Sequence, residues 1–285
     1  VGDFDGDGFL DLAVGEHAYA DGASNNAGRV VIYRGTATGL DPDDPWTLIG
    51  EDAGDLLGYA VGACDIDGDG LDDLIAGSPG LDDDRLSPTV GQTGGVVVYL
   101  GTSTGPSLHG AWYGINDDDG LRAEAGQAIA VGDLDGDLGC DVAVGSAAGD
   151  AFDGDQNRGG VWLLRDQELL SGNTWRRIGH LAPTDTEVND LGFQLAMGPA
   201  PGSTHDALFV GARLASELET RGGRVLGFTS DTLTSASSAL DVAGADWILD
   251  GPNVQDLLGH DLALGPDTLC NAEAPLSRHN RLRRC

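Results

Sequence analysis

Short apolar runs bounded by glycine and aspartate recur along the whole chain. A run of four residues ending in Gly occurs at Leu12–Gly15, Leu74–Gly77, Val142–Gly145 and Leu208–Gly211. After a polar insert, a run led by Gly follows at Gly28–Tyr33, Gly95–Tyr99, Gly160–Leu164 and Gly223–Phe228. These runs are too short for helices, rich in β-branched and aromatic residues, and flanked by helix breakers. The pattern therefore predicts β-strands.

Two further elements complete each repeat. A Gly-containing segment opens each unit, and its leading glycines (Gly58, Gly126, Gly192 and Gly259) are 68, 66 and 67 residues apart. The last element is marked by Trp46, Trp112, Trp175 and Trp247. Four strands per unit at near-constant spacing are typical of a β-propeller blade. We therefore expect an all-β protein built from four-stranded antiparallel blades.

The repeat also predicts how the chain is divided. We expect blade units at about residues 1–57, 58–125, 126–191 and 192–258, with the start of a fifth at 259–269. The first unit lacks its opening strand, since the sequence begins within the pattern, and we expect the chain to be a piece of a longer protein. The pattern is lost from 270 to 285, where an Arg-rich end (278–285) matches nothing upstream. We expect this tail to lie outside the fold, as a disordered, linker or truncated segment.

Three acidic loops of the form D-x-D-x-D-G-x-x-D follow the opening segments: loop 1 (Asp3–Asp11), loop 2 (Asp65–Asp73) and loop 3 (Asp133–Asp141). Ca²⁺ takes six to eight hard oxygen ligands, which alternate Asp residues on a curled loop can supply. The predicted ligands are the carboxylates at positions one, three, five and nine, with the backbone carbonyl at position seven. In chain order they are Asp3, Asp5, Asp7, Phe9 and Asp11; Asp65, Asp67, Asp69, Leu71 and Asp73; and Asp133, Asp135, Asp137, Gly139 and Asp141.

Mutual repulsion favours a cation in these loops over a solvated turn. Two carboxylates about 4–5 Å apart repel by about 3–4 kcal/mol at an effective dielectric near 20. We expect calcium in loops 1 and 2, and a third ion in loop 3, where Leu138 replaces the position-six Gly. An EF-hand is excluded because position twelve is Val14, Ala76 or Val144 instead of an acid. The fourth loop, Gly198–Asp206, lacks the alternate acids and should bind no metal.

These features resemble FG-GAP repeats, the blades of the integrin α-subunit propeller and of many bacterial surface proteins. The resemblance rests on Leu57–Gly58 before loop 2, the acidic pattern within it, and Ala76–Pro79 after it. It extends over residues 1 to about 269 and implies a seven-bladed propeller with calcium in loops on one face and ligands on the opposite face. About four blades are present, so the resemblance implies an incomplete ring.

Composition restricts the possible partners. The 285 residues carry 15 basic against 47 acidic side chains, for a net charge of −32. Nucleic acid is therefore not an expected partner, because it requires clustered positive charge. Direct membrane insertion is not expected either, since no run of eighteen apolar residues is present. Four cysteines (Cys64, Cys140, Cys270 and Cys285) lack C-x-x-C spacing, which leaves disulfides and the redox state open.

The expected function is a calcium-binding, adhesion-type module of an extracellular or cell-surface protein that binds a protein or a glycan. Catalysis is not expected, because the six histidines (His17, His109, His180, His205, His260 and His279) occupy non-equivalent positions without a nucleophile motif. Two alternatives remain open. The chain could be the propeller portion of a secreted enzyme whose catalytic residues lie elsewhere, or a passive spacer.

Overall fold

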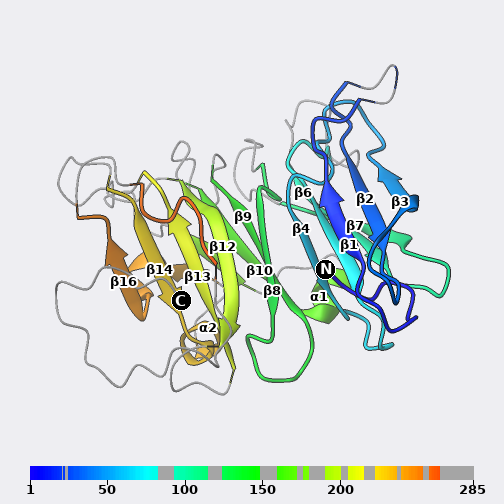
Figure 1. Cartoon of the computed structure of the whole chain (residues 1–285). Coiled ribbons are helices and arrows are strands. Elements are labelled where there is room, and N and C mark those ends of the chain that lie inside the picture. Colours follow the sequence, from blue (N-terminus) through cyan, green and yellow to red (C-terminus); the bar gives the residue numbers. More distant parts are fainter. Residues whose placement is uncertain are drawn as a thin grey trace.

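The computed structural model confirms an all-β protein, an incomplete β-propeller built from side-by-side antiparallel sheets (Figure 1). It describes residues 1–20, 22, 25–82, 93–114, 124–147, 159–171, 176–179, 190–199, 205–214, 222–235, 239–252 and 257–263. The expected tail at 270–285, most of the start of a fifth unit, and Trp175 lie outside the described residues.

Each sheet collects the strands of one stretch of sequence. The first contains β1 (Leu12–Gly15), β2 (Arg29–Arg34) and β3 (Asp41–Ile49). The second contains β4 (Val61–Cys64), β5 (Asp73–Ser78), β6 (Gly95–Leu100) and β7 (Ser107–Tyr113). The third contains β8 (Ala128–Gly132), β9 (Asp141–Ser146), β10 (Gly160–Leu164) and β11 (Arg176–Gly179). The fourth contains β12 (Leu191–Pro199), β13 (Asp206–Ala212), β14 (Arg224–Phe228) and β16 (Trp247–Asp250).

Neighbouring sheets are joined by apolar cores. Phe4, Ile32, Leu57 and Leu74, among others, fill the space between the first and second sheets and are fully buried. Trp112 and Trp162 meet edge to face, with ring centroids 5.9 Å apart, between the second and third. A third cluster, which includes Phe228, joins the third sheet to the fourth. Burial between blades is therefore what holds consecutive repeats together.

Paired glycines allow the sheets to approach at one end. A Cβ on Gly77 at the end of β5 would overlap the carbonyl oxygen of Gly126, the leading glycine of the next unit. Gly126 itself has a φ of +100°, which L side chains rarely adopt. The same contact recurs between Gly15 and Gly58, Gly145 and Gly192, and Gly211 and Gly259. The two glycines of each repeat are thus complementary parts of one inter-blade contact.

Short elements after the third strands of the last two sheets depart from the expected pattern. Helix α1 (Asp166–Ser171) follows β10, and helix α2 (Ser230–Ser235) follows β14. Beyond α2, β15 (Ala239–Asp241) pairs in parallel with β11 of the third sheet, and the 3₁₀ turn η1 (Val242–Gly244) leads to β16. The fourth unit therefore contributes a fifth strand to the sheet before it.

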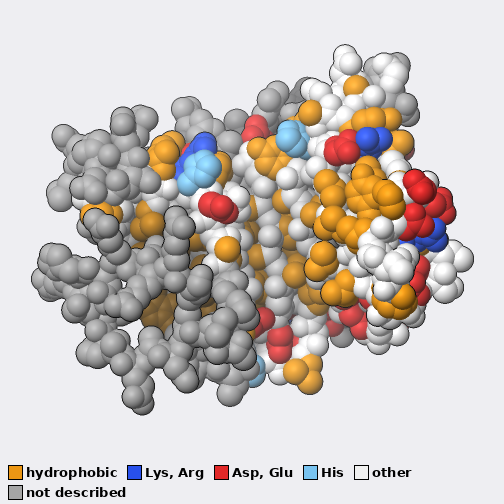
Figure 2. Space-filling view, viewed as in Figure 1, with side chains coloured by type: hydrophobic (Ala, Val, Ile, Leu, Met, Phe, Trp, Pro, Cys, Tyr) orange, Lys and Arg blue, Asp and Glu red, His pale blue; other side chains and the backbone are white. Residues whose placement is uncertain are grey.

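Apolar side chains gather on the surface over the first sheet (Figure 2). Val14 and Ile49 of that sheet are 37% and 43% exposed, and at the other end of the arc Ile248 and Leu249 of β16 are also exposed. Within the described part of the chain, no helix has the length and apolar character needed to cross a membrane.

Candidate metal centre

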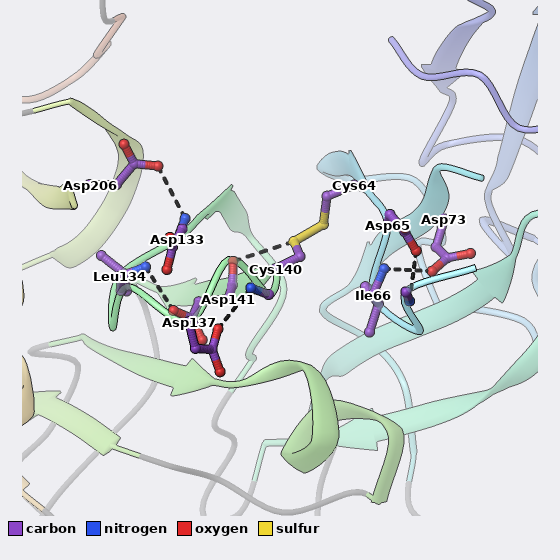
Figure 3. The surroundings of a disulfide bond; sticks show 12 residues. Cys64, Asp65, Ile66, Asp73, Asp133, Leu134, Asp137, Cys140, Asp141 and Asp206 are labelled. Carbon is purple, nitrogen blue, oxygen red and sulfur yellow. Dashed lines mark hydrogen bonds between the residues drawn. A yellow bond between two sulfur atoms is a disulfide. The ribbon is translucent and has the colours of Figure 1, made fainter. Parts of the chain in front are cut away.

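The acidic loops occupy the same place in successive sheets. Loop 2 connects β4 to β5, and loop 3 connects β8 to β9. Loop 1 precedes β1 and is closed by an isolated bridge between Gly2 and Asp11. Figure 3 shows loops 2 and 3 as neighbours at the border between their sheets.

Each loop brings three of its predicted ligands together. Carboxylate oxygens at positions one, three and nine lie within 4.8 Å of one another in every loop. The triads are Asp3, Asp5 and Asp11; Asp65, Asp67 and Asp73; and Asp133, Asp135 and Asp141. Asp7, Asp69 and Asp137 at position five are outside these triads. Such all-oxygen clusters suit a hard divalent cation.

The position-nine carboxylates are buried and firmly placed. Asp11, Asp73 and Asp141 are at most 2% exposed. Oδ2 of Asp11 accepts the N–H of Phe4 at 3.1 Å, and Oδ1 accepts the N–H of Gly35 at 2.7 Å. Asp73 repeats this arrangement with Ile66 and Gly101. The last acid is thereby fixed to position two of its own loop and to the residue that follows the third strand of its repeat.

The position-one carboxylate holds the loop in a tight curl. Asp65 accepts the N–H of Gly68 at 2.8 Å through Oδ1 and that of Gly70 at 2.9 Å through Oδ2. Asp3 holds loop 1 in the same way. Gly70 has a φ of +91°, which explains the glycine at position six.

Positions five and seven are joined by a hydrogen bond. The N–H of Phe9 donates to Asp7, that of Leu71 to Asp69, and that of Gly139 to Asp137, at 2.7–2.9 Å. These bonds hold each position-five carboxylate against the backbone of position seven in its own loop. The predicted role of the position-seven carbonyls as ligands stays a prediction.

Burial disfavours the ionised form of the position-nine carboxylates. Burial raises the pKa of Asp141 to about 7, an effect that the N–H of Leu134 reduces and the charges of Asp135 and Asp137 increase. Burial likewise raises the pKa of Asp11 and Asp73 above the ordinary value, although their backbone N–H donors lower it. A bound cation would compensate this penalty by favouring the ionised form.

Among the described residues, a cationic side chain contacts the triad of loop 3 but none contacts those of loops 1 and 2. Arg165 directly follows β10, and its Nε lies 2.8 Å from Oδ2 of Asp135. Strand register makes it equivalent to Leu100 and to Arg34, which forms an ion pair with Asp44 instead. Burial raises the pKa of Asp135, and the Arg165 charge lowers it. The guanidinium therefore already neutralises part of the third triad.

Leu138 at position six adds backbone strain to loop 3. It adopts a φ of +69° with its side chain 91% exposed. A non-glycine residue in this left-handed region costs on the order of 1 kcal/mol. In the described part of the chain no hydrogen bond joins the Leu138 N–H to Asp133, in contrast to the bond from Gly70 to Asp65.

The fourth loop has a different alignment from the one that its sequence suggests. Strand register places Ala207 opposite Gly198, as Asp73 stands opposite Cys64. Ala207 therefore takes position nine, and Asp206 takes position eight, equivalent to Asp72.

Two features of the loops were not predicted from the sequence. The residue at position two (Phe4, Ile66 or Leu134) is apolar, at most 3% exposed, and inserted into an inter-blade core. The repeated apolar residue between two acids is the signal that could have shown it. The second feature is a disulfide between Cys64 and Cys140, whose redox state the sequence left open. Cys270 and Cys285 lie outside the described residues.

Comparison with known proteins agrees with this architecture. The FG-GAP repeat family matches residues 1–33 and 57–99, which include loops 1 and 2. This chain contains FG-GAP repeats. It is 28% identical to integrin alpha-PS2 of Drosophila melanogaster over 231 residues (74% of this chain and 15% of that protein) and 32% identical to integrin alpha-5 of Xenopus laevis over 169 residues (59% and 15%).

The similarity also extends to a differently named group. Phosphatidylinositol-glycan-specific phospholipase D of Bos taurus is 29% identical over 151 residues, which are 50% of this FG-GAP chain and 17% of that protein. The chain thus spans about a sixth of the length of these relatives.

Proposed function

We propose that this chain is a calcium-binding β-propeller module of an extracellular or cell-surface protein that binds a protein or a glycan. The observation that carries the calcium proposal is the carboxylate triad, repeated in three loops with oxygens within 4.8 Å. Loops 1 and 2 are proposed as the two principal sites. Loop 3 is proposed as a third, weaker site, because Arg165 contacts Asp135 there.

Calcium is favoured over magnesium by the donor set. Each loop offers four carboxylates and a backbone carbonyl, which suits an ion that takes six to eight oxygens in flexible geometry. Extracellular modules bind calcium with constants of about 0.1–1 mM. At tenfold excess each occupied site would add about 1.4 kcal/mol to the free energy of unfolding.

Thermal unfolding tests the calcium proposal. With calcium in excess, two occupied sites should raise the melting temperature by about 5–10 °C relative to a chelator. Asp5→Asn and Asp67→Asn, which each remove one triad charge, should each reduce the shift, whereas Asp43→Asn in β3, outside the loops, should not. An equal melting temperature in calcium and chelator would contradict the proposal.

The adhesion role is supported by the integrin α similarity, although the chain spans only 15% of those proteins. We propose that the FG-GAP segment belongs to a surface protein and that its ligand is a protein or a glycan. Immobilised protein should capture ligands from panels of extracellular-matrix proteins and glycans, with weaker capture after chelation. A passive spacer would capture none.

A second candidate is the propeller portion of a secreted enzyme, favoured by the similarity to phosphatidylinositol-glycan-specific phospholipase D. Under this proposal the catalytic residues lie outside this chain. The isolated chain should then leave a glycosylphosphatidylinositol substrate intact while the parent protein cleaves it. A parent protein without such activity would exclude this candidate.

The proposed blade units remain 1–57, 58–125, 126–191 and 192–258, with a fifth beginning at 259–269. The borders at 57/58 and 125/126 fall between the last strand of one sheet and the first of the next, the border at 191/192 falls at the first residue of β12, and that at 258/259 follows β16. Limited proteolysis should give fragments that end near these borders.

A further inference from the structure

Position eight of loop 2 and of the fourth loop contacts the start of the preceding loop. Asp72 accepts the N–H of Asp3 through Oδ2 at 2.8 Å, and its own N–H donates to the Asp3 carbonyl at 3.0 Å. Asp206 holds Asp133 with the same two bonds, at 3.1 and 3.0 Å. Asp3 and Asp133 stand at position one. These contacts therefore fix the first predicted ligand of a loop from the neighbouring blade.

The middle border has a covalent bond at the same place. Position eight of loop 3 is Cys140, and its disulfide partner Cys64 directly precedes Asp65 (Figure 3). The Cα atoms of the two cysteines are 6.2 Å apart. Cys140 also directly precedes Asp141, so one bond joins residues adjacent to a ligand of loop 2 and a ligand of loop 3.

The residue before position one of a loop varies together with the residue at position eight of the next loop. It is Gly2 opposite Asp72, and Gly132 opposite Asp206. A Cβ on Gly2 would lie 2.8 Å from the Asp72 Cβ, and one on Gly132 would lie 2.5 Å from Oδ2 of Asp206. The aspartate at position eight therefore fills the space that a side chain on the glycine would need. A glycine–aspartate pair at two borders and the Cys64–Cys140 pair at the middle border are two alternative ways to fill the same space.

We propose that position eight is an inter-blade latch that positions the first metal ligand of the neighbouring loop, and that the Cys64–Cys140 latch makes calcium binding by loops 2 and 3 sensitive to thiols. This inference rests on the proposed calcium function. The latch couples adjacent loops through Asp72 and Asp206 by hydrogen bonds and through Cys140 by a covalent bond.

Reduction would open the middle latch. A dithiol such as dithiothreitol transfers two electrons and two protons to the bond: the S–S bond breaks, two S–H bonds form, and the dithiol becomes its cyclic disulfide. The resulting thiols do not reproduce the paired hydrogen bonds of the other borders. Loss of a group that supports a metal ligand weakens affinity by about ten- to a hundredfold. We expect reduction to weaken calcium binding by loops 2 and 3 about tenfold.

Titration calorimetry with calcium chloride tests the latch. The Asp5→Asn background reports loops 2 and 3, and the Asp67→Asn/Asp135→Asn background reports loop 1 as the matched control. Dithiothreitol and Cys64→Ser/Cys140→Ser should each weaken the first background about tenfold and leave the second unchanged. Cys64→Gly/Cys140→Asp, which recreates the latch of the other borders, should keep the affinity with and without dithiothreitol.

Hydrogen exchange measured in chelator tests the latch in the absence of bound calcium. In chelator, hydrogen exchange of the loop 2 amides should accelerate on reduction of the wild type and stay unchanged in Cys64→Gly/Cys140→Asp. Calcium affinity that dithiothreitol and Cys64→Ser/Cys140→Ser both leave unchanged would overturn the latch alone. Absence of calcium binding by the oxidised wild type would overturn the proposed function and the thiol sensitivity with it, while hydrogen exchange would still decide the latch.

Discussion

At the scale of single residues, aspartates that look alike in the sequence have separate tasks. Asp65 at position one curls its loop, Asp73 at position nine is buried, and Asp72 beside it reaches the neighbouring blade. The alternate spacing predicts the acidic loop, but it does not distinguish Asp72 from its neighbours. That distinction depends on which blade packs against Asp72, and no local pattern marks this particular contact.

Arg165 is expected to weaken cation binding by loop 3, because its guanidinium contacts Asp135. Arg165→Leu introduces the residue type of Leu100, which strand register makes equivalent in the second sheet. The substitution should strengthen calcium binding by loop 3 about tenfold, because a tenfold change in affinity corresponds to the free energy of about one charge-assisted hydrogen bond. Titration calorimetry measures this change. Arg213→Leu, which removes an ion pair to Asp190 outside the loops, is the control, and an unchanged loop 3 affinity would refute the role of Arg165.

Asp55 should give stability a specific pH dependence. It is 5% exposed, and burial raises its pKa to about 6. The folded protein therefore retains this proton at pH values where the unfolded chain loses it, so stability falls as pH rises from about 4 to about 6.

The expected loss from Asp55 is about 2 kcal/mol over that interval. Urea unfolding across the interval should show a steeper decline in wild type than in Asp55→Asn, which cannot ionise. Parallel pH profiles for the two proteins would count against this assignment.

At the scale of elements, the repeat predicts most strands, but it does not predict the helices α1 and α2 or the strand β15. The second strands (β1, β5, β9 and β13) coincide closely with the predicted apolar runs, because β-branched residues between glycines are a strong local signal. Helices α1 and α2 have only six residues each, too few for a helical period. Strand β15 pairs with another blade, and sequence periodicity carries no information about that partner.

The glycine contact between blades predicts a position-specific penalty. Gly77→Ala should lower the free energy of unfolding by about 3 kcal/mol, because the new Cβ would overlap the Gly126 carbonyl and backbone must move. Gly110→Ala in β7 of the same sheet is the control, since its Cβ would meet nothing within 4 Å. Chemical denaturation measures both. An equal loss of unfolding free energy in the two variants would show that the close approach of Gly77 to Gly126 does not determine the penalty.

At the scale of the whole molecule, electrostatic repulsion among the acidic side chains opposes the packing of the sheets against one another. With a net charge of −32, the acidic side chains repel one another, while apolar inter-blade cores hold the sheets together and the loops bring three carboxylates within 4.8 Å. Composition predicts the repulsion from the sequence, and the structure shows where it concentrates.

Salt should therefore stabilise the metal-free protein. Raising sodium chloride from about 20 to about 500 mM shortens the screening length severalfold. The melting temperature in chelator should rise with salt, and the rise should be smaller in calcium, where bound ions already neutralise the loops. Differential scanning calorimetry in the two buffers measures the difference. A rise as large in calcium as in chelator would argue against loop neutralisation.

The most direct test of calcium in the acidic loops is anomalous diffraction from crystals grown with calcium. We expect anomalous peaks in loops 1 and 2, from ions coordinated by Asp3, Asp5, Asp7, Asp11 and the Phe9 carbonyl in loop 1 and by the equivalent residues in loop 2. Ordered loops that contain only water at millimolar calcium would contradict it.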